Sequence, residues 1–216
     1  MFIRNWMRKK PFTVPSEMNA SEALKILEEK KLPFVSIVDN GVLRGILTRR
    51  DARGAASAVT STQSVHEMNF FNERLKVKDL MIRKPLTVTV NDTIETALNL
   101  GADMGRSFFP VIDGETLVGT ICDRDIKDAL SQILYADEAL SGITLEDDQL
   151  TGDFLPEIVN TVTGTGAVVR SLFTLKDPET GKKRLLMRVE TRKLNSVLDE
   201  LREKGYRVVE SVEAQV

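Results

Sequence analysis

The sequence predicts an α+β protein: two tandem β-α-β-β-α repeats that form a pseudo-symmetric pair, followed by a small β-α-β-β-α-β domain. Three observations predict this arrangement. The first half of the chain repeats itself without a gap, each copy alternates short apolar runs with amphipathic segments, and the last third follows a different order of elements. With 216 residues, 42% of them hydrophobic, the chain is long enough to bury the cores that this arrangement needs.

An internal repeat organises the first half of the chain. Residues Met7–Val14 read MRKKPFTV and residues Met81–Val88 read MIRKPLTV, so that Pro11 and Pro85 lie 74 residues apart. The same offset aligns other identical residues in one register: Ala23, Leu24, Phe34, Asp39, Leu43, Gly45, Arg50 and Asp51 match Ala97, Leu98, Phe108, Asp113, Leu117, Gly119, Arg124 and Asp125. We therefore infer two copies of one structural unit.

Each copy opens with an extended segment and a helix. The steps Lys10–Pro11 and Lys84–Pro85 force extended backbone, and a short Thr-Val strand follows each of them. Apolar residues at helical spacing then predict an amphipathic helix. The segments Asn19–Glu22 and Asp92–Glu95 resemble capping boxes at the helix starts.

A predicted hairpin and a second helix complete each copy. Asn-Gly or Asp-Gly steps separate the paired apolar runs, which is a strong hairpin signal; the runs are Phe34–Val38 with Val42–Leu47, and Phe108–Ile112 with Leu117–Cys122. Neither copy is large enough to be stable alone, so we expect the halves to pack sheet against sheet, with their second helices lining the contact. The expected domain limits are 1–60 and 77–136 for the repeats, 61–76 for a linker with a helix extension, and 140–216 for the last domain.

The turn from the hairpin into the second helix carries the most faithfully repeated pattern. It reads GILTRRD at Gly45–Asp51 and GTICDRD at Gly119–Asp125. A helix N-terminus suits a phosphate, the hydroxyl of Thr48 adds a donor, and an aspartate one turn later accepts hydrogen bonds from a vicinal diol. Together these groups suggest a ribonucleotide. The alternative is that the glycines serve only strand geometry and that both aspartates only cap their helices.

On these residues the first 135 or so positions resemble a cystathionine-β-synthase (CBS) domain pair, also called a Bateman module, and Phe109–Asp113 looks like its PVVD strand. The resemblance implies a non-catalytic regulatory module that binds AMP, ADP or ATP, or alternatively S-adenosylmethionine, between the repeats. It would transmit energy status to an enzyme partner or to the last domain. Such pairs assemble in twos, so a homodimer is expected.

By position, the resemblance assigns roles to particular side chains. The two aspartates would hold the ribose, and Thr48 and the two arginines would hold the phosphate. The threonines of the opening strands would line the adenine or phosphate side, and the aromatic residues and the proline would form walls for the base. The residues concerned are Thr13, Phe34, Thr48, Arg50, Asp51, Thr87, Phe108, Phe109, Pro110, Cys122, Arg124 and Asp125. Cys122 stands where the family has Ser or Thr. Because a thiol is a weak donor, the site with Cys122 is expected to hold phosphate less well. Alternatively, Phe34 and Phe108 are core residues and Cys122 is a small buried hydrophobe.

The last third predicts a separate small domain. Its expected elements are strands at 142–146, 167–175, 184–190 and 206–212, and helices around 154–162 and 194–204. This order is the split-βαβ, ferredoxin-like one, and it looks like an ACT domain, which binds amino acids or pairs its sheets between subunits. That resemblance makes Asp148 and Gly152 candidate ligand residues; the alternative is a domain that only dimerises or packs. A CBS pair followed by such a domain resembles the bacterial acetoin-utilisation regulators.

Composition excludes several other classes. Thirty basic residues against 32 acidic ones give a net charge of −2, which argues against a nucleic-acid binder. One cysteine and one histidine cannot build a zinc site, so no metal or other cofactor is expected. No apolar run is long enough to cross a membrane and no export signal is visible, so we expect a cytoplasmic protein. A constitutive scaffold with a vestigial cleft is the main alternative function, and an enzyme is the more distant one.

Overall fold

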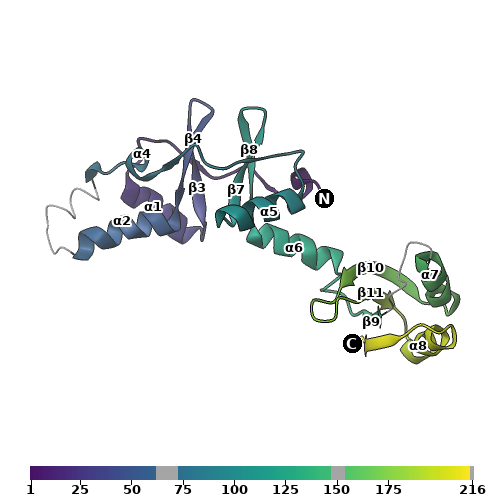
Figure 1. The fold of residues 1–216 in the computed structure, drawn as a ribbon. Coiled ribbons are helices and arrows are strands. Elements are labelled where there is room, and N and C mark those ends of the chain that lie inside the picture. The colour runs from purple at the N-terminus through teal and green to yellow at the C-terminus, as the bar shows by residue number, and fades with distance from the viewer. Residues whose placement is uncertain (62–72, 147–153, 215–216) are drawn as a thin grey trace. The chain divides into compact units, whose positions relative to one another are not determined.

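The computed structural model describes residues 1–61, 73–146 and 154–214, which form two compact units, Met1–Lys127 and Asp128–Val216 (Figure 1). Helix α6 (Asp123–Ile133) begins in the first unit and continues into the second. None of the helices within these ranges is long and apolar enough to span a membrane. The predicted limits of 136 and 140 between the second repeat and the last domain stay predictions.

Both repeats have the predicted order of elements. The first consists of β2 (Thr13–Val14), α1 (Ala20–Glu29), β3 (Phe34–Asp39), β4 (Val42–Thr48) and α2 (Arg49–Ser61). The second consists of β6 (Val88–Thr89), α5 (Ile94–Met104), β7 (Phe108–Asp113), β8 (Thr116–Cys122) and α6. Short elements that the sequence did not predict precede them: the 3-10 turn η1 (Ile3–Asn5), β1 (Arg8–Lys9), α4 (Val77–Leu80) and β5 (Ile82–Arg83).

The two repeats exchange their first short strands. Strand β1 pairs with β8 of the second repeat, where Arg8 lies opposite Thr120, and β5 pairs with β4 of the first repeat, where Ile82 lies opposite Ile46. Strands β4 and β8 also meet each other, so that the strands form one sheet with the central order β2-β3-β4-β8-β7-β6. The prediction that the halves pack sheet against sheet is therefore wrong, because backbone hydrogen bonds between the repeats join their strands into one sheet.

Two glycines make the exchange possible. A Cβ atom on Gly119 would lie 2.8 Å from the carbonyl oxygen of Arg8, and one on Gly45 would lie 2.6 Å from that of Ile82. Real Cβ atoms do not approach backbone oxygen so closely, so only glycine lets the exchanged strands reach their partners. This supports the interpretation that both glycines serve strand geometry.

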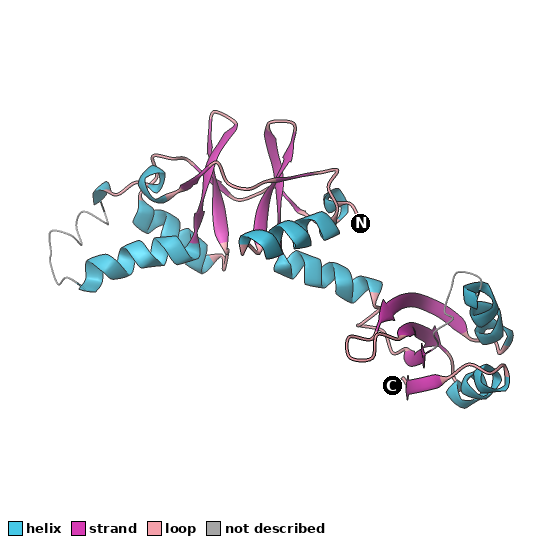
Figure 2. Cartoon of the chain, viewed as in Figure 1, coloured by secondary structure: helices cyan, strands magenta, loops and turns pink. Residues whose placement is uncertain are grey.

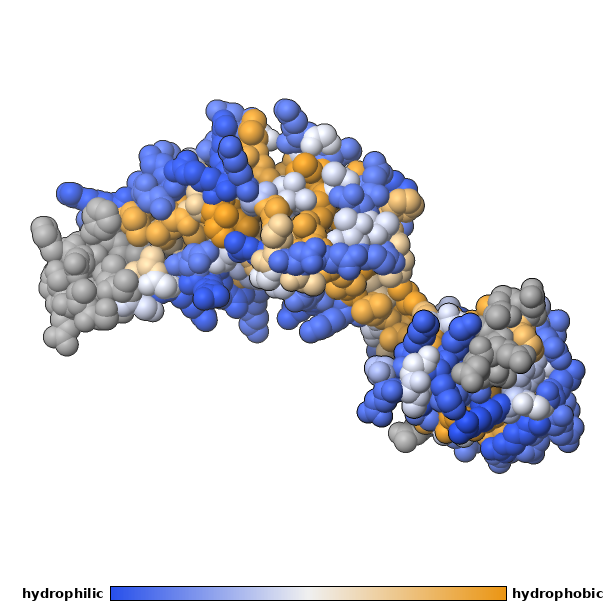
Figure 3. Space-filling view, in the orientation of Figure 1, coloured by the Kyte–Doolittle hydropathy of each residue, from blue (hydrophilic) through white to orange (hydrophobic). Residues whose placement is uncertain are grey.

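Helix packing against the strands forms the core of the first repeat. Its fully buried side chains include Leu27 of α1, Val35 and Ile37 of β3, and Leu47 of β4. Hydrophobic residues also show on the surface of the first unit in Figure 3. The exposed large hydrophobic side chains of this unit include Phe12, Val42, Leu86 and Leu98.

The helix starts differ from the predicted capping boxes. Asn19 does precede α1, but its side chain accepts a hydrogen bond from Lys76 Nζ (2.7 Å) and makes no cap. Helix α5 begins one residue later than predicted, and Thr93 caps it by accepting from the amide of Thr96. The Asn19 side chain therefore pairs with a distant residue instead of capping α1, and the better-placed hydroxyl of Thr93 caps α5 in place of Asp92.

The second unit has the predicted β-α-β-β-α-β order. Its strands and helices are shown in Figure 2. Its elements are β9 (Ser141–Glu146), α7 (Phe154–Gly164), β10 (Val168–Lys176), β11 (Lys183–Glu190), α8 (Leu194–Glu203) and β12 (Val208–Val212). The strands are antiparallel in the order β10-β11-β9-β12, and side chains of α7 and α8 share one core with the sheet. The candidate ligand residues Asp148 and Gly152 lie outside the described residues.

A buried glutamate organises charge at the end of β9. Glu146 is 7% exposed and pairs with Lys182 (3.3 Å), Arg184 (3.3 Å) and Arg207 (3.2 Å). Burial alone raises its pKa, but the hydrogen bonds from Lys182 and Arg184 outweigh burial and leave the pKa below its ordinary value. The carboxylate therefore stays charged and holds β9, β11 and the segment before β12 together.

Candidate functional site

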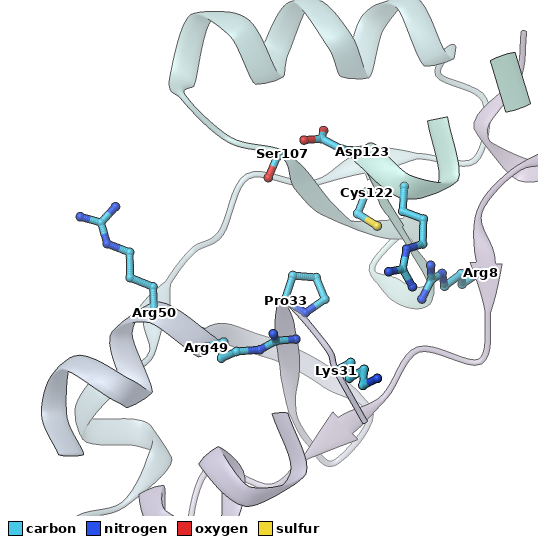
Figure 4. A pocket seen from close by; sticks show the side chains of 9 residues that line it. Arg8, Lys31, Pro33, Arg49, Arg50, Ser107, Cys122 and Asp123 are labelled. Carbon is cyan, nitrogen blue, oxygen red and sulfur yellow. The ribbon is translucent and has the colours of Figure 1, made fainter. Parts of the chain in front are cut away.

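A cavity of 410 Å³ lies where the two helices α2 and α6 begin in the first unit (Figure 4). Its lining comes from both repeats and is strongly basic. The lining residues are Arg8, Lys31, Pro33, Arg49, Arg50, Ser107, Cys122, Asp123 and Arg124. Five of these residues are cationic and only Asp123 is acidic. Two helix N-termini add partial positive charge at the same place, so the cavity favours an anion.

A smaller cavity of 210 Å³ adjoins the first and shares Arg8, Pro33 and Cys122 with it. The rest of its lining is more apolar and includes Lys10, Pro11, Phe12, Leu32, Phe34, Thr120 and Asp125. The opening segment of one repeat thus meets the helix start of the other. Strand exchange between β1 and β8 is the cause of this meeting.

Asp125 is buried in the wall of the smaller cavity, with 7% of its surface exposed. The amide of Cys122 donates to its Oδ2 (2.8 Å), which places the carboxylate across the first turn of α6. Arg8 Nε donates to its Oδ1 at 2.6 Å, in an ion pair between the repeats. Sequence reasoning missed Arg8; the available signal was that the matching position of the second copy, residue 82, is isoleucine.

Asp51, the matching aspartate, has a different environment. Its side chain is exposed, and the buried Thr48 hydroxyl donates to its Oδ2 (2.6 Å) while the Asp51 amide donates back to Thr48 Oγ1 (3.0 Å). Within residues 1–61, 73–146 and 154–214, no cation pairs with this carboxylate. Both aspartates therefore act at their helix starts, as the capping interpretation expects, but among the described residues only Asp125 has an arginine partner.

The sequence model of the CBS domain matches residues 3–58 and 77–132, which together make up just over half of the chain. The chain belongs to the CBS-domain family. The predicted duplication and the predicted CBS-domain pair are confirmed, and the two matched stretches are named CBS1 and CBS2 below. Among curated proteins, an uncharacterized protein of Methanocaldococcus jannaschii (MJ0188) is 30% identical over 129 residues. That stretch is 57% of this chain and 42% of the relative, so the chain spans less than half of the relative's length.

Solved structures share the fold of the CBS pair. CBSX2 in complex with AMP is 23% identical, with a TM-score of 0.52, over 62% of this chain and 98% of its own. The CBS pair of protein MJ0100, in complex with 5'-methylthioadenosine and S-adenosylmethionine, is 23% identical, with a TM-score of 0.51, over 61% of this chain and 97% of its own. A Vibrio cholerae protein described as an acetoin utilization protein (AcuB) is 21% identical, with a TM-score of 0.53, over 63% of this chain and 95% of its own. At these identities the likeness shows the fold alone.

An aromatic stack joins CBS1 to CBS2 beside the site. The rings of Phe34 and Phe108 lie 4.6 Å apart between centroids and 22° from parallel. Phe34 is 5% exposed and lines the smaller cavity, whereas Phe108 is half-buried. Phe34 is thus both a core residue and a cavity wall, so the two interpretations of it are compatible.

The structure brings only some of the predicted residues together. Phe34, Cys122 and Asp125 share the smaller cavity, and Arg50 and Arg124 line the larger one with Cys122. The other seven lie outside the described lining of both cavities, and their predicted roles stay predictions: Thr13, Thr48, Asp51, Thr87, Phe108, Phe109 and Pro110. The cations Lys31 and Arg49, to which the sequence assigned no ligand role, also line the larger cavity. Lys31 follows the end of α1, and Arg49 is the first residue of α2.

Cys122 is half-buried at the junction of the two cavities. Burial raises the pKa of its thiol, and the carboxylate of Asp125 raises that pKa further. A thiol with a raised pKa stays protonated and is a poor nucleophile. The geometry therefore agrees with the interpretation of Cys122 as a small, unreactive wall residue.

Proposed function

We propose that this chain is a non-catalytic regulatory module whose CBS pair binds an adenine nucleotide, AMP, ADP or ATP, between the repeats. The carrying observation is the buried Asp125 carboxylate in a partly apolar cavity that adjoins a strongly cationic one. The partly apolar cavity suits a base, the carboxylate suits the ribose diol, and the cationic cavity suits a phosphate. The structures of CBSX2 with AMP and of the MJ0100 pair with two adenosine compounds support an adenosine ligand.

In the proposed complex the base occupies the smaller cavity between Phe12, Phe34 and Thr120. The ribose hydroxyls donate to Asp125, and each such hydrogen bond to a charged acceptor contributes about 1.5–3 kcal/mol. The 5'-phosphate then extends toward the basic side chains of the larger cavity. The matching site around Thr48 and Asp51 takes a second ligand by the pseudo-symmetry of the pair.

Binding would couple the two repeats because the Asp125 site draws on both of them. Phe12 and Phe34 belong to CBS1, whereas Thr120 and Asp125 belong to CBS2. A ligand that contacts both favours the arrangement in which they fit it. A coupling free energy of about 1–3 kcal/mol is enough to shift a two-state balance that the last domain or an enzyme partner reads.

For the second unit, we propose a ferredoxin-like ACT domain. The element order, the strand order β10-β11-β9-β12 and the single face covered by α7 and α8 support this proposal. Its role would be to dimerise the chain or to bind an amino acid. With the AcuB-like neighbour of the CBS pair, this domain supports a cytoplasmic, homodimeric regulator of the acetoin-utilisation type.

Thermal melts of the whole chain with and without AMP, ADP or ATP test the nucleotide proposal. At 100 times the dissociation constant, the ligand is expected to stabilise the folded protein by about 2.7 kcal/mol. In an Asp51→Ala background, which lacks the second diol acceptor, Asp125→Ala is expected to remove most of the remaining effect. Asp103→Asn, at an exposed position of α5, is the matched control and leaves it unchanged. If no adenosine compound moves the melting curve, the proposed function is wrong.

A constitutive scaffold is the second candidate, because both aspartates already make hydrogen bonds within the protein. A scaffold needs assembly but no ligand. Light scattering that shows the same dimer with and without nucleotide, combined with melts that do not respond to any adenosine compound, would favour it.

A further inference from the structure

Arg8 makes the two halves of the CBS pair unequal. In the exchanged strands, Arg8 pairs with Thr120 and Ile82 pairs with Ile46, which are matching positions of the two repeats. A guanidinium therefore faces the aspartate of one site, and an aliphatic side chain takes its place at the other. The Arg8 side chain is 44% exposed while its partner Asp125 is 7% exposed, so the arginine reaches from the open cavity to a buried carboxylate.

Arg8 also connects the two cavities. Of the three residues that line both of them, Arg8, Pro33 and Cys122, only Arg8 carries a charge. Arg49, in contrast, donates its Nε–H to the carbonyl oxygen of Leu32 (2.8 Å), so its guanidinium is already held by backbone. Arg8 is thus the cation of the larger cavity whose carboxylate partner is the proposed ribose acceptor.

We propose that Arg8 makes the Asp125 site selective for nucleosides that carry an anion on the ribose 5' carbon. This rests on the proposed function and names the ligand class within it: adenosine 5'-phosphates in preference to neutral adenosine or cationic S-adenosylmethionine. A diol that binds Asp125 competes with Arg8 for Oδ1, while the Cys122 amide keeps Oδ2. A phosphate in the larger cavity gives the displaced guanidinium a new anionic partner, and guanidinium and phosphate match in geometry.

A ligand without a phosphate lacks this compensation. Adenosine would displace Arg8 from a buried carboxylate and offer it no anion in return. S-adenosylmethionine carries a sulfonium directly on the 5' carbon, which would face cations of the larger cavity such as Lys31, Arg50 and Arg124. Its carboxylate lies at the far end of the methionine chain, not at the 5' position where a phosphate sits. Discrimination by one or two charge-assisted hydrogen bonds corresponds to about 10- to 100-fold in affinity.

The test uses Arg8→Ile, which installs the residue of the matching position 82, in a full-length Asp51→Ala background that removes the other diol acceptor. Calorimetric titration with AMP and with adenosine gives the affinity ratio. In the background chain AMP is expected to bind about 10- to 100-fold more tightly. Arg8→Ile is expected to bring the affinity ratio near one, because AMP binds more weakly and adenosine more tightly. Arg8→Lys is expected to keep part of the preference for AMP. Arg53→Ala removes an exposed ion pair with Glu28 and is the matched control, with an unchanged ratio.

The outcomes distinguish failure of the role proposed for Arg8 from failure of nucleotide binding itself. Equal binding of AMP and adenosine by the background chain, or an unchanged ratio in Arg8→Ile, overturns the role of Arg8 and leaves the proposed function standing. Binding of adenosine by Arg8→Ile alone supports Arg8 as the competitor for Asp125. If neither chain binds either compound while both melt cooperatively, nucleotide binding at this site is itself wrong, and the selectivity falls with it.

Discussion

Replacing Gly119 with alanine tests the strand exchange that brings Arg8 to Asp125. The added Cβ would lie 2.8 Å from the carbonyl oxygen of Arg8 and 2.8 Å from Met7 Sδ. The methionine side chain can move aside, but the backbone oxygen belongs to the β1–β8 ladder, so the two strands must separate by several tenths of an ångström. Overpacking of this kind costs about 1–3 kcal/mol. For a unit of this size we expect the melting temperature to fall by about 3–10 °C.

Gly54→Ala is the matched control, because it makes the same chemical change in the opposite structural setting. Gly54 lies in helix α2, and its added Cβ would meet nothing within 4 Å. Alanine is a better helix former than glycine, so this variant is expected to be more stable by about 0.5–1 kcal/mol. Circular dichroism melts of both variants measure the difference. A Gly119→Ala protein as stable as the wild type would refute the close approach of β1 to β8.

Three other predictions follow from the described contacts. Phe34→Ala is expected to destabilise the first unit by about 3–4 kcal/mol, and a double-mutant cycle with Phe108→Ala to show about 1 kcal/mol of coupling by denaturant unfolding, because the rings stack between the repeats. The pKa of Glu146 is depressed in the folded state, so its stabilising contribution is present above the ordinary glutamate pKa of about 4.3 and is lost as pH falls through the lower folded value. In melts between pH 7 and 3, the stability of Glu146→Gln is therefore expected to fall less steeply with pH than that of the wild type. Equal dependence of stability on pH in the two proteins would contradict this role. AMP affinity is expected to fall as salt rises, because the larger cavity is cationic; titrations at 50 and 500 mM salt that give the same affinity would count against phosphate binding there.

Local patterns were sufficient for the elements but not for all of their ends. Turn residues and apolar periodicity predicted the hairpins, the helices and the order of elements in both units. They placed both helix starts within one residue. They were wrong about the capping hydrogen bonds, because Asn19 finds a distant partner in Lys76 and Thr93 is better placed than Asp92. The candidate site was predictable in part for the same reason. Phe34 and Asp125 belong to repeated motifs, whereas Lys31, which no motif marks, joins the site through the packing of CBS1 against CBS2.

The sequence by itself determined the duplicated unit, the glycines of the strand turns and the two aspartates at the helix starts, since each follows from neighbours a few residues away. Only the tertiary structure decided which opening segment faces which aspartate. The two opening segments read almost alike, and a two-residue strand has no local preference for one partner over the other. Arg8 and Asp125 are 117 residues apart and meet because Gly119 admits the exchanged strand, a close approach that exists only when both repeats are packed.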